Sequence, residues 1–193
     1  VRSHNGMTGR EAAERILHSQ GIYDVRVEHV SGNLTDHYDP RTKRLALSQD
    51  VYGRTSVAAV CVAAHECGHA IQHNINYAPL NIRSAIVPVA NIGSSLSWPI
   101  FLLGLIFSIP ALTTVGIVLF SLAVLFQLVT LPVEFNASSR ALKTLESFQM
   151  LNQQEIEGAR KVLSAAAMTY VAAAFSAIMT LLRLVLISRN RRD

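Results

Sequence analysis

The sequence predicts an α+β domain joined to a membrane helical bundle of about three crossings. Two observations lead to this fold class. Residues 1–83 combine helical and strand patterns with nine basic and eight acidic side chains, as a domain in contact with water does. Residues 84–133 carry no charged side chain, and fifty uncharged residues in a row are typical of membrane segments.

A short helix and a small sheet are expected ahead of residue 50. Thr8 and Glu11 have the spacing of a capping box, so a helix is predicted over residues 8–20, with Gly21 ending it. Alternation of apolar and polar residues predicts strands in three places, residues 23–27, 34–38 and 44–48.

The stretch from Thr55 to His73 predicts one buried helix, because Ala, Val and Ile dominate it and it contains no proline. His65 and His69 lie four residues apart, so they share one helical face and can hold one metal ion. Glu66 follows His65 directly, where a carboxylate can reach a water on that metal. This HExxH pattern is typical of zinc metalloproteases. Ordinary core histidines are the competing interpretation.

A third metal ligand is needed, because a catalytic zinc usually takes three protein ligands and a water. His73 shares the face of the other two histidines but lies two turns beyond His65, about 12 Å along the helix, so a structural role is expected for it. Glu134 is the better candidate. Two membrane crossings return the chain to its starting side, and Glu134 is the first charged residue after the return. An ordinary interfacial carboxylate is the alternative.

Three membrane crossings are expected. Residues 98–109 are too few to span about 30 Å of hydrocarbon, so the first crossing must begin near Ile86. Pro110 marks a turn, and residues 111–131 form the second crossing. The third covers residues 162–182, whose small side chains four apart suit close helix packing. A buried Ala-rich helix of a soluble domain is the alternative for this last segment.

In the first crossing a stripe with spacings of three and four is formed by Asn91, Ser94, Ser95 and Trp98. Polar groups in hydrocarbon are unfavourable unless they pair or face water. The stripe is therefore predicted to face the other membrane helices or the cleft below the metal. The alternative is that the serines bond to their own helix.

Composition argues against several classes of protein. The water-facing part is nearly neutral, so no nucleic-acid partner is expected. Cys61 and Cys67 lie six residues apart on one helix and cannot pair, so both are expected to be small core residues. No signal peptide is visible after Val1, and a preceding N-terminal piece is expected.

Four motifs carry a family resemblance. They are LTDHYDPRTKRLALSQDVY at 34–52, HECGHAIQH at 65–73, YAPLNIRSAIVPVANIGS at 77–94 and LPVEFNASSRAL at 131–142. Together they resemble the neutral zinc metallopeptidases of bacterial membranes, the YugP type, and more distantly the HtpX and CAAX-prenyl-protease group of membrane gluzincins. The resemblance covers nearly the whole chain.

The resemblance implies a zincin-like fold and one Zn²⁺ per chain. His65, His69 and Glu134 would be the metal ligands, and Glu66 the general base. In such zinc peptidases a sheet edge takes the substrate as an added strand; the strands 34–38 and 44–48 serve either that purpose or a purely structural one.

The sequence departs from the wider group at two positions behind the third ligand. An acid expected four residues after Glu134 is Ser138, and one expected two residues after it is Asn136, so the support of the ligands is an open question. Candidates for stabilising the oxyanion or supporting the ligands are His37, Tyr77, Ser138, Arg140 and Tyr170.

The predicted function is an integral-membrane zinc metalloendopeptidase that hydrolyses peptide bonds in membrane or membrane-proximal proteins, using a zinc-activated water. Its partners are a polypeptide substrate and the lipid bilayer, and its expected location is the bacterial cell membrane, as a multi-pass protein. One alternative is a catalytically silent scaffold or binding protein that keeps the zincin fold. Another is a zinc-storage or zinc-sensing protein, which would not need Glu66.

The expected division of the chain follows from these elements. It comprises a zincin-like domain at 1–83, two transmembrane helices at 84–133, a polar helical segment returning to the zinc site at 134–161, a third transmembrane helix at 162–188 and a basic tail at 189–193.

Overall fold

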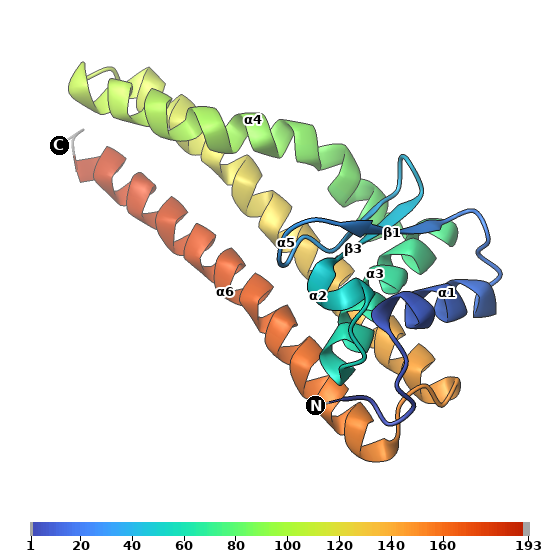
Figure 1. The fold of residues 1–193 in the computed structure, drawn as a ribbon. Helices are drawn as coiled ribbons and strands as arrows, with labels where there is room; N and C mark the ends of the chain where they lie inside the picture. Colours follow the sequence, from blue (N-terminus) through green and yellow to red (C-terminus); the bar gives the residue numbers. More distant parts are fainter. Residues whose placement is uncertain (1, 191–193) are drawn as a thin grey trace. The chain divides into compact units, whose positions relative to one another are not determined.

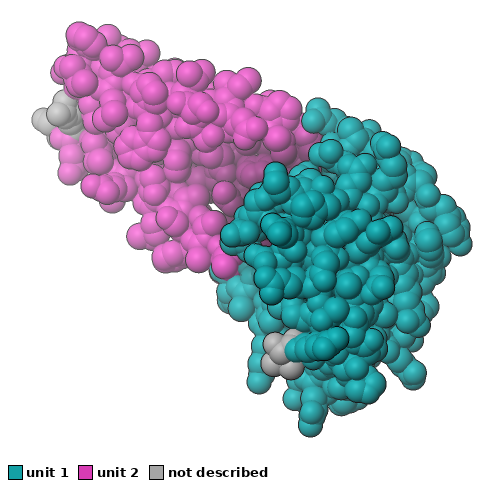
Figure 2. Space-filling model, in the orientation of Figure 1, with its two compact units in different colours: residues 1–77, 133–168 teal, residues 78–132, 169–193 magenta. Residues whose placement is uncertain are grey.

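The computed structural model describes residues 2–190 (Figure 1). The elements are α1 (Gly9–Ser19), β1 (Arg26–Val30), β2 (His37–Asp39), β3 (Arg44–Ser48), α2 (Gln49–Tyr52), α3 (Val57–Asn74), α4 (Ala78–Ile106), α5 (Pro110–Ser147) and α6 (Gln153–Asn190). They form two compact units, one of residues 1–77 and 133–168 and the other of residues 78–132 and 169–193 (Figure 2). Most of the predicted basic tail, residues 191–193, lies outside the described residues.

Helix α1 begins as its capping box predicts. The Glu11 backbone N–H donates to Thr8 Oγ1 at 3.2 Å, and the Thr8 backbone N–H donates to Glu11 Oε2 at 2.8 Å. The helix ends just before Gly21, which has φ +69°. The helix prediction for residues 8–20 is confirmed.

The sheet is small and mixed, with strand order β1-β3-β2. Strand β3 is central, pairs in parallel with β1 and antiparallel with β2, and occupies residues 44–48 as predicted. Strand β1 begins at Arg26, later than the alternation from Tyr23 suggested. The prediction for residues 34–36 was wrong, because Leu34 is 95% exposed and has φ +57°, which a strand does not allow.

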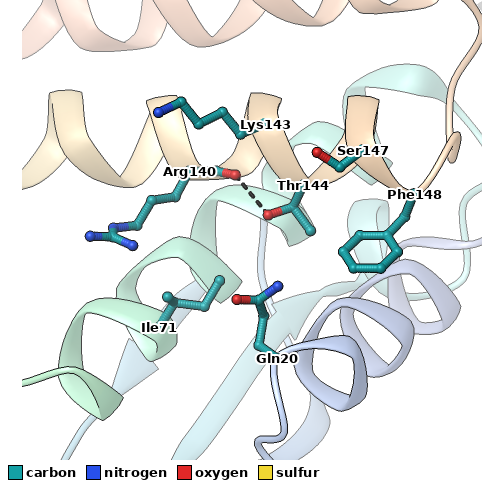
Figure 3. Close-up of a pocket in the computed structure, with 7 residues that line it drawn as sticks. All are labelled: Gln20, Ile71, Arg140, Lys143, Thr144, Ser147 and Phe148. Carbon is teal, nitrogen blue, oxygen red and sulfur yellow. Dashed lines mark hydrogen bonds between the residues drawn. The ribbon is translucent and has the colours of Figure 1, made fainter.

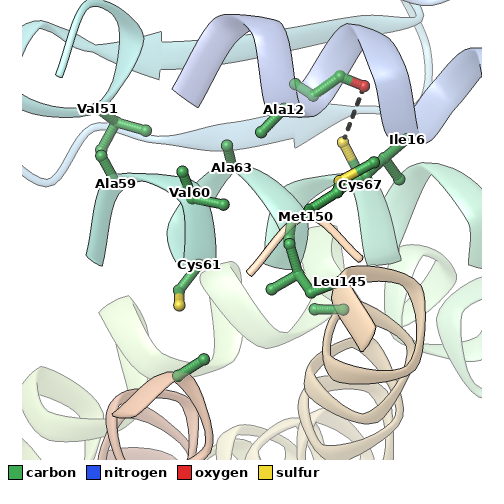
Figure 4. Packing of buried hydrophobic residues seen from close by; sticks show 14 of the residues in the cluster. Ala12, Ile16, Val51, Ala59, Val60, Cys61, Ala63, Cys67, Leu145 and Met150 are labelled. Atoms are coloured by element: carbon green, nitrogen blue, oxygen red, sulfur yellow. Dashed lines mark hydrogen bonds between the residues drawn. The ribbon is translucent and has the colours of Figure 1, made fainter. Parts of the chain in front are cut away.

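The core of the first unit gathers buried residues of α1, β3, α3, α5 and α6. Ser56 caps α3 by accepting from the Ala59 backbone N–H at 3.1 Å. Figure 4 shows Cys61 and Cys67 within this core, and the Cys67 thiol donates to the Ala13 carbonyl. Burial raises the pKa of the Cys61 thiol to about 12. Both cysteines are therefore the small core residues that the sequence predicted.

Helix α5 continues without a break from its apolar part into its polar part. Pro132 lies inside the helix, where the sequence analysis had ended the second crossing at residue 131. A proline inside a helix usually costs about 3 kcal/mol, but membrane helices tolerate it. The polar segment 134–161 accordingly consists of the end of α5 and the start of α6, separated by residues 148–152.

Three helices of the described residues, α4, α5 and α6, are long and apolar enough to cross a membrane. In the second unit α4 and α5 approach each other very closely. A Cβ placed on Gly104 would lie 2.5 Å from the Thr113 backbone nitrogen, so a side chain at this position would separate the two helices.

The polar stripe of α4 does not face a partner helix. Ser94 and Ser95 donate to the Asn91 carbonyl at 3.1 and 2.8 Å, and the Asn91 residue is exposed. The prediction that this stripe packs against other helices was wrong. The alternative holds, because a serine hydroxyl can be satisfied by a carbonyl one turn back in its own helix.

Candidate metal centre

Three potential ligands converge at one point in the first unit. Helix α3 presents His65 and His69 on one face, as their spacing requires, and α5 presents Glu134. Glu134 Oε2 lies 3.1 Å from His65 Nε2 and 3.5 Å from His69 Nε2. One ligand atom from each of the three residues lies within 4.8 Å of the others, so a single ion can contact all three.

These residues fit a zinc ion. Two ligands at about 2.0–2.1 Å from a tetrahedral zinc lie about 3.3 Å from each other, which falls between the two observed distances. Two imidazole nitrogens and one carboxylate oxygen also form a donor set that catalytic zinc uses, with a fourth position left for water. The side chain of Glu134 is 2% exposed, and a carboxylate this deeply buried requires charged or hydrogen-bonding partners.

Close contact between two helices brings the ligands together. A Cβ placed on Gly68 would lie 2.6 Å from the Ala137 backbone oxygen, so the α3 and α5 backbones touch at this level. Gly68 lies inside the HExxH helix, where glycine costs about 1 kcal/mol relative to alanine. Its close approach to α5 explains its presence. This role was not predicted from the sequence, although a glycine inside a helical pattern can indicate close packing.

The site has a negative electrostatic character in the absence of metal. Burial acts to lower the pKa of His69, because a charged ring loses hydration there. The hydrogen bond with Glu134 and the charges of Glu66 and Glu134 act in the opposite direction and prevail, so the pKa lies above its ordinary value. The arrangement favours a positive charge at His69, which a proton or a metal ion can supply.

Each histidine also has a partner for its second ring nitrogen. His65 Nδ1 lies 3.1 Å from Ser138 Oγ, and His69 Nδ1 lies 3.0 Å from Gln72 Oε1. Such partners orient the rings of metal-binding histidines. Ser138 is one of the two positions where the sequence departs from the expected acids, and its hydroxyl takes up a supporting contact.

The partner of His69 is itself held in place. Gln72 is fully buried, and its Nε2 donates to the Val133 carbonyl at 2.8 Å and to Asn136 Oδ1 at 3.0 Å. Arg140 Nε donates to the same Asn136 oxygen at 2.7 Å. Asn136, the second departure, therefore also belongs to the support of the ligands.

Comparison with known proteins identifies the family. The family described as "Putative neutral zinc metallopeptidase" matches residues 1–189. The chain belongs to the neutral zinc metallopeptidase family. The resemblance noted from its motifs is confirmed.

The chain is also similar to a protein of Bacillus subtilis strain 168 named "Putative membrane protease YugP". The two are 50% identical over 193 residues, which is all of this chain and 86% of the relative. No solved structure matches the chain.

The other predicted site residues of this family member occupy different places. Glu66 is 9% exposed and follows His65 in α3. His37 is exposed on β2, and its Nδ1 lies 2.8 Å from the Thr35 carbonyl oxygen. Tyr77 is half-buried just beyond α3, and Tyr170 belongs to the second unit.

Two further polar residues near α3 are accounted for by the structure. His73 bonds through Nδ1 to the Tyr38 hydroxyl at 2.8 Å, which links α3 to β2 and agrees with its expected structural role. Gln72 is the supporting residue that sequence reasoning missed. Its position three residues after His69, on a buried helix, was the available signal.

A pocket of about 370 Å³ lies next to Arg140, one of the residues behind His69 (Figure 3). It is lined by Gln20, Ile71, Arg140, Lys143, Thr144, Ser147 and Phe148. Arg140 belongs to both the pocket and the support, whereas His65, His69 and Glu134 do not line the pocket. The pocket is therefore a neighbour of the metal centre and not the centre itself.

Proposed function

We propose that this chain is an integral-membrane zinc endopeptidase in which His65, His69 and Glu134 hold one zinc ion. The observation that carries the proposal is the convergence of these three ligand atoms at a buried point, although His65 and Glu134 lie 69 residues apart in the chain. Membership of the zinc metallopeptidase family supports peptide hydrolysis, and the three long apolar helices support a place in the membrane.

Zinc bound at this centre supplies Lewis acidity that activates a water and the scissile carbonyl. Glu66 accepts the proton of the attacking water and passes it to the leaving nitrogen as the peptide bond breaks. Glu66 is suited to this role because it adjoins a ligand without contributing to the cluster itself, and its charge acts on His69. The proposed roles of ligand and base thus fall to different carboxylates.

The contacts of the remaining candidate site residues separate those that support the ligands from those that could stabilise the oxyanion. Ser138 and Arg140 support the ligands, because their polar groups are engaged with His65 and Asn136. His37, Tyr77 and Tyr170 stay candidates for stabilising the oxyanion.

The proposed organisation follows the chain. A zincin-like domain of residues 1–83 is completed by the polar segment 134–161, the crossings lie within 84–133 and 162–188, and a basic tail covers 189–193. The protein would pass through the bacterial cell membrane several times and act on polypeptides in or near the bilayer.

The test combines metal analysis with a proteolysis assay on the full chain in detergent, comparing the natural protein with Glu66→Gln. Glu66→Gln should keep stoichiometric zinc and lose at least about 100-fold in turnover, because it removes the proton acceptor but no ligand. Natural-like turnover in this variant would rule out the mechanism. A zinc-loaded natural protein without proteolytic activity would favour the silent scaffold or the storage protein instead.

A further inference from the structure

The hydrogen bonds behind His69 have only one possible direction. Arg140 Nε is always a donor, so the atom of Asn136 that it contacts is the amide oxygen. The Val133 carbonyl is always an acceptor. Gln72 contacts both of these acceptors through one atom, which must therefore be its amide nitrogen. The amide oxygen of Gln72 is left facing His69.

This direction determines where the His69 ring carries its proton. An amide oxygen only accepts, so the His69 Nδ1 that lies 3.0 Å from it must be protonated. In a neutral imidazole the other nitrogen then holds a lone pair. That nitrogen, Nε2, lies 3.5 Å from Glu134 Oε2. Without a metal ion a protonated Nε2 donates to this carboxylate, and once a cation replaces that proton both atoms present lone pairs to it.

We propose that Gln72 is a positioning residue that fixes His69 in the Nδ1-protonated tautomer and so presents its Nε2 lone pair to the metal. The Val133 carbonyl and the Asn136–Arg140 pair hold the Gln72 amide in the required orientation. Turning the amide over would place oxygen against two acceptors in a fully buried site, which is strongly unfavourable. That the ion is zinc rests on the proposed function, whereas the assignment of the tautomer rests on the hydrogen bonds alone.

The tautomer is measured on the metal-free full chain in detergent, with ¹⁵N-labelled histidine, at alkaline pH. All samples carry Glu134→Ala, because Glu134 is a competing acceptor at His69 Nε2. Long-range ¹H–¹⁵N correlation distinguishes a protonated from an unprotonated ring nitrogen, and a His69→Gln sample assigns the signal. We expect Nδ1 of His69 to carry the proton. A proton on Nε2 in this background, where Gln72 faces Nδ1 and Glu134 is absent, would overturn the inference.

Variants test whether Gln72 causes this preference. Gln72→Leu removes the acceptor, so His69 should become a mixture of tautomers, whereas Gln72→Glu keeps an acceptor and should keep Nδ1 protonated. Ser138→Ala is the matched control, because it removes the partner of His65 and should leave the His69 signals unchanged. Unchanged His69 signals in a folded Gln72→Leu, or an equal change in Ser138→Ala, would contradict the proposal.

Metal affinity provides the second readout. Zinc competition against a chelator should show about 10- to 100-fold weaker binding in Gln72→Leu than in the natural protein, the range typical of residues that support metal ligands. Natural-like affinity in Gln72→Leu would contradict the role in metal binding. If the tautomer behaves as expected but the natural protein binds no zinc, the proposed function fails and the assignment of the tautomer stands.

Discussion

The two histidines of the metal centre share Glu134 in front but differ in what stands behind them. His65 is backed by the Ser138 hydroxyl, which can donate or accept and therefore imposes no tautomer. His69 is backed by Gln72, whose orientation is set by the Val133 carbonyl and the Asn136 amide. The hydrogen-bond partner of His65 can thus adapt to either tautomer, whereas the partner of His69 accepts only. Four substitutions test this difference, and the first removes Glu134, which both histidines contact.

Glu134→Ala should have the largest effect, because it removes the group that both imidazoles contact and leaves a buried cavity. We expect zinc binding to weaken by more than about 100-fold, the upper range for loss of a mere supporting residue, and activity to be lost. Zinc content after dialysis and a peptidase assay measure this. Glu146→Ala, an exposed residue on the same helix, is the control and should keep both. Full zinc occupancy in Glu134→Ala would show that another residue completes the site.

Gly68→Ala should displace both histidines together and lower the stability of the fold. The added Cβ would meet the Ala137 backbone oxygen and push α3 away from α5. Overpacking of this kind costs about 1–3 kcal/mol. Thermal unfolding of the full chain in detergent should show the loss. Gly158→Ala is the matched control, since nothing lies within 4 Å of its Cβ and alanine favours the helix. Equal melting temperatures for Gly68→Ala and the natural protein would refute the close approach.

Ser138→Ala removes only the hydrogen-bond partner of His65. Loss of the hydroxyl frees His65 Nδ1, and we expect zinc affinity to fall by about 10-fold, the lower end of the range for supporting residues. Chelator competition measures the effect beside Gln72→Leu. If Ser138→Ala proved more harmful than Gln72→Leu, His65 would be the more dependent ligand, and the comparison would be reversed.

Arg140→Met should have the smallest effect. It removes one donor to Asn136, but the Val133 carbonyl still orients the Gln72 amide. We expect zinc affinity to fall by less than about 10-fold. Lys143→Met is the matched control, because Lys143 lines the same pocket as Arg140 (Figure 3) and should leave the affinity unchanged. A loss as large as that of Gln72→Leu would mean that Arg140, and not the carbonyl, sets the direction.

Local patterns predicted the elements of the first unit better than their ends. The capping box of α1 and the strand at residues 44–48 were found, because both depend on neighbouring residues. The second strand begins later than predicted, because Leu34 takes a left-handed backbone conformation, which an alternating pattern does not reveal. The continuity of α5 through Pro132 was not predicted, because the change from apolar to polar composition at this point does not reveal that the helix continues.

The sequence by itself determined that His65 and His69 share a helical face, since their spacing matches one helical turn. It also singled out Glu134, because two predicted crossings would return the chain to the side of the membrane on which His65 and His69 lie. Tertiary structure alone decided how the site is supported. The direction of the Gln72 amide depends on acceptors 61 and 64 residues further along the chain, and the packing at Gly68 depends on the backbone of another helix. Hydrogen-bond direction and close packing are properties of groups already brought together, so no pattern within one segment can contain them.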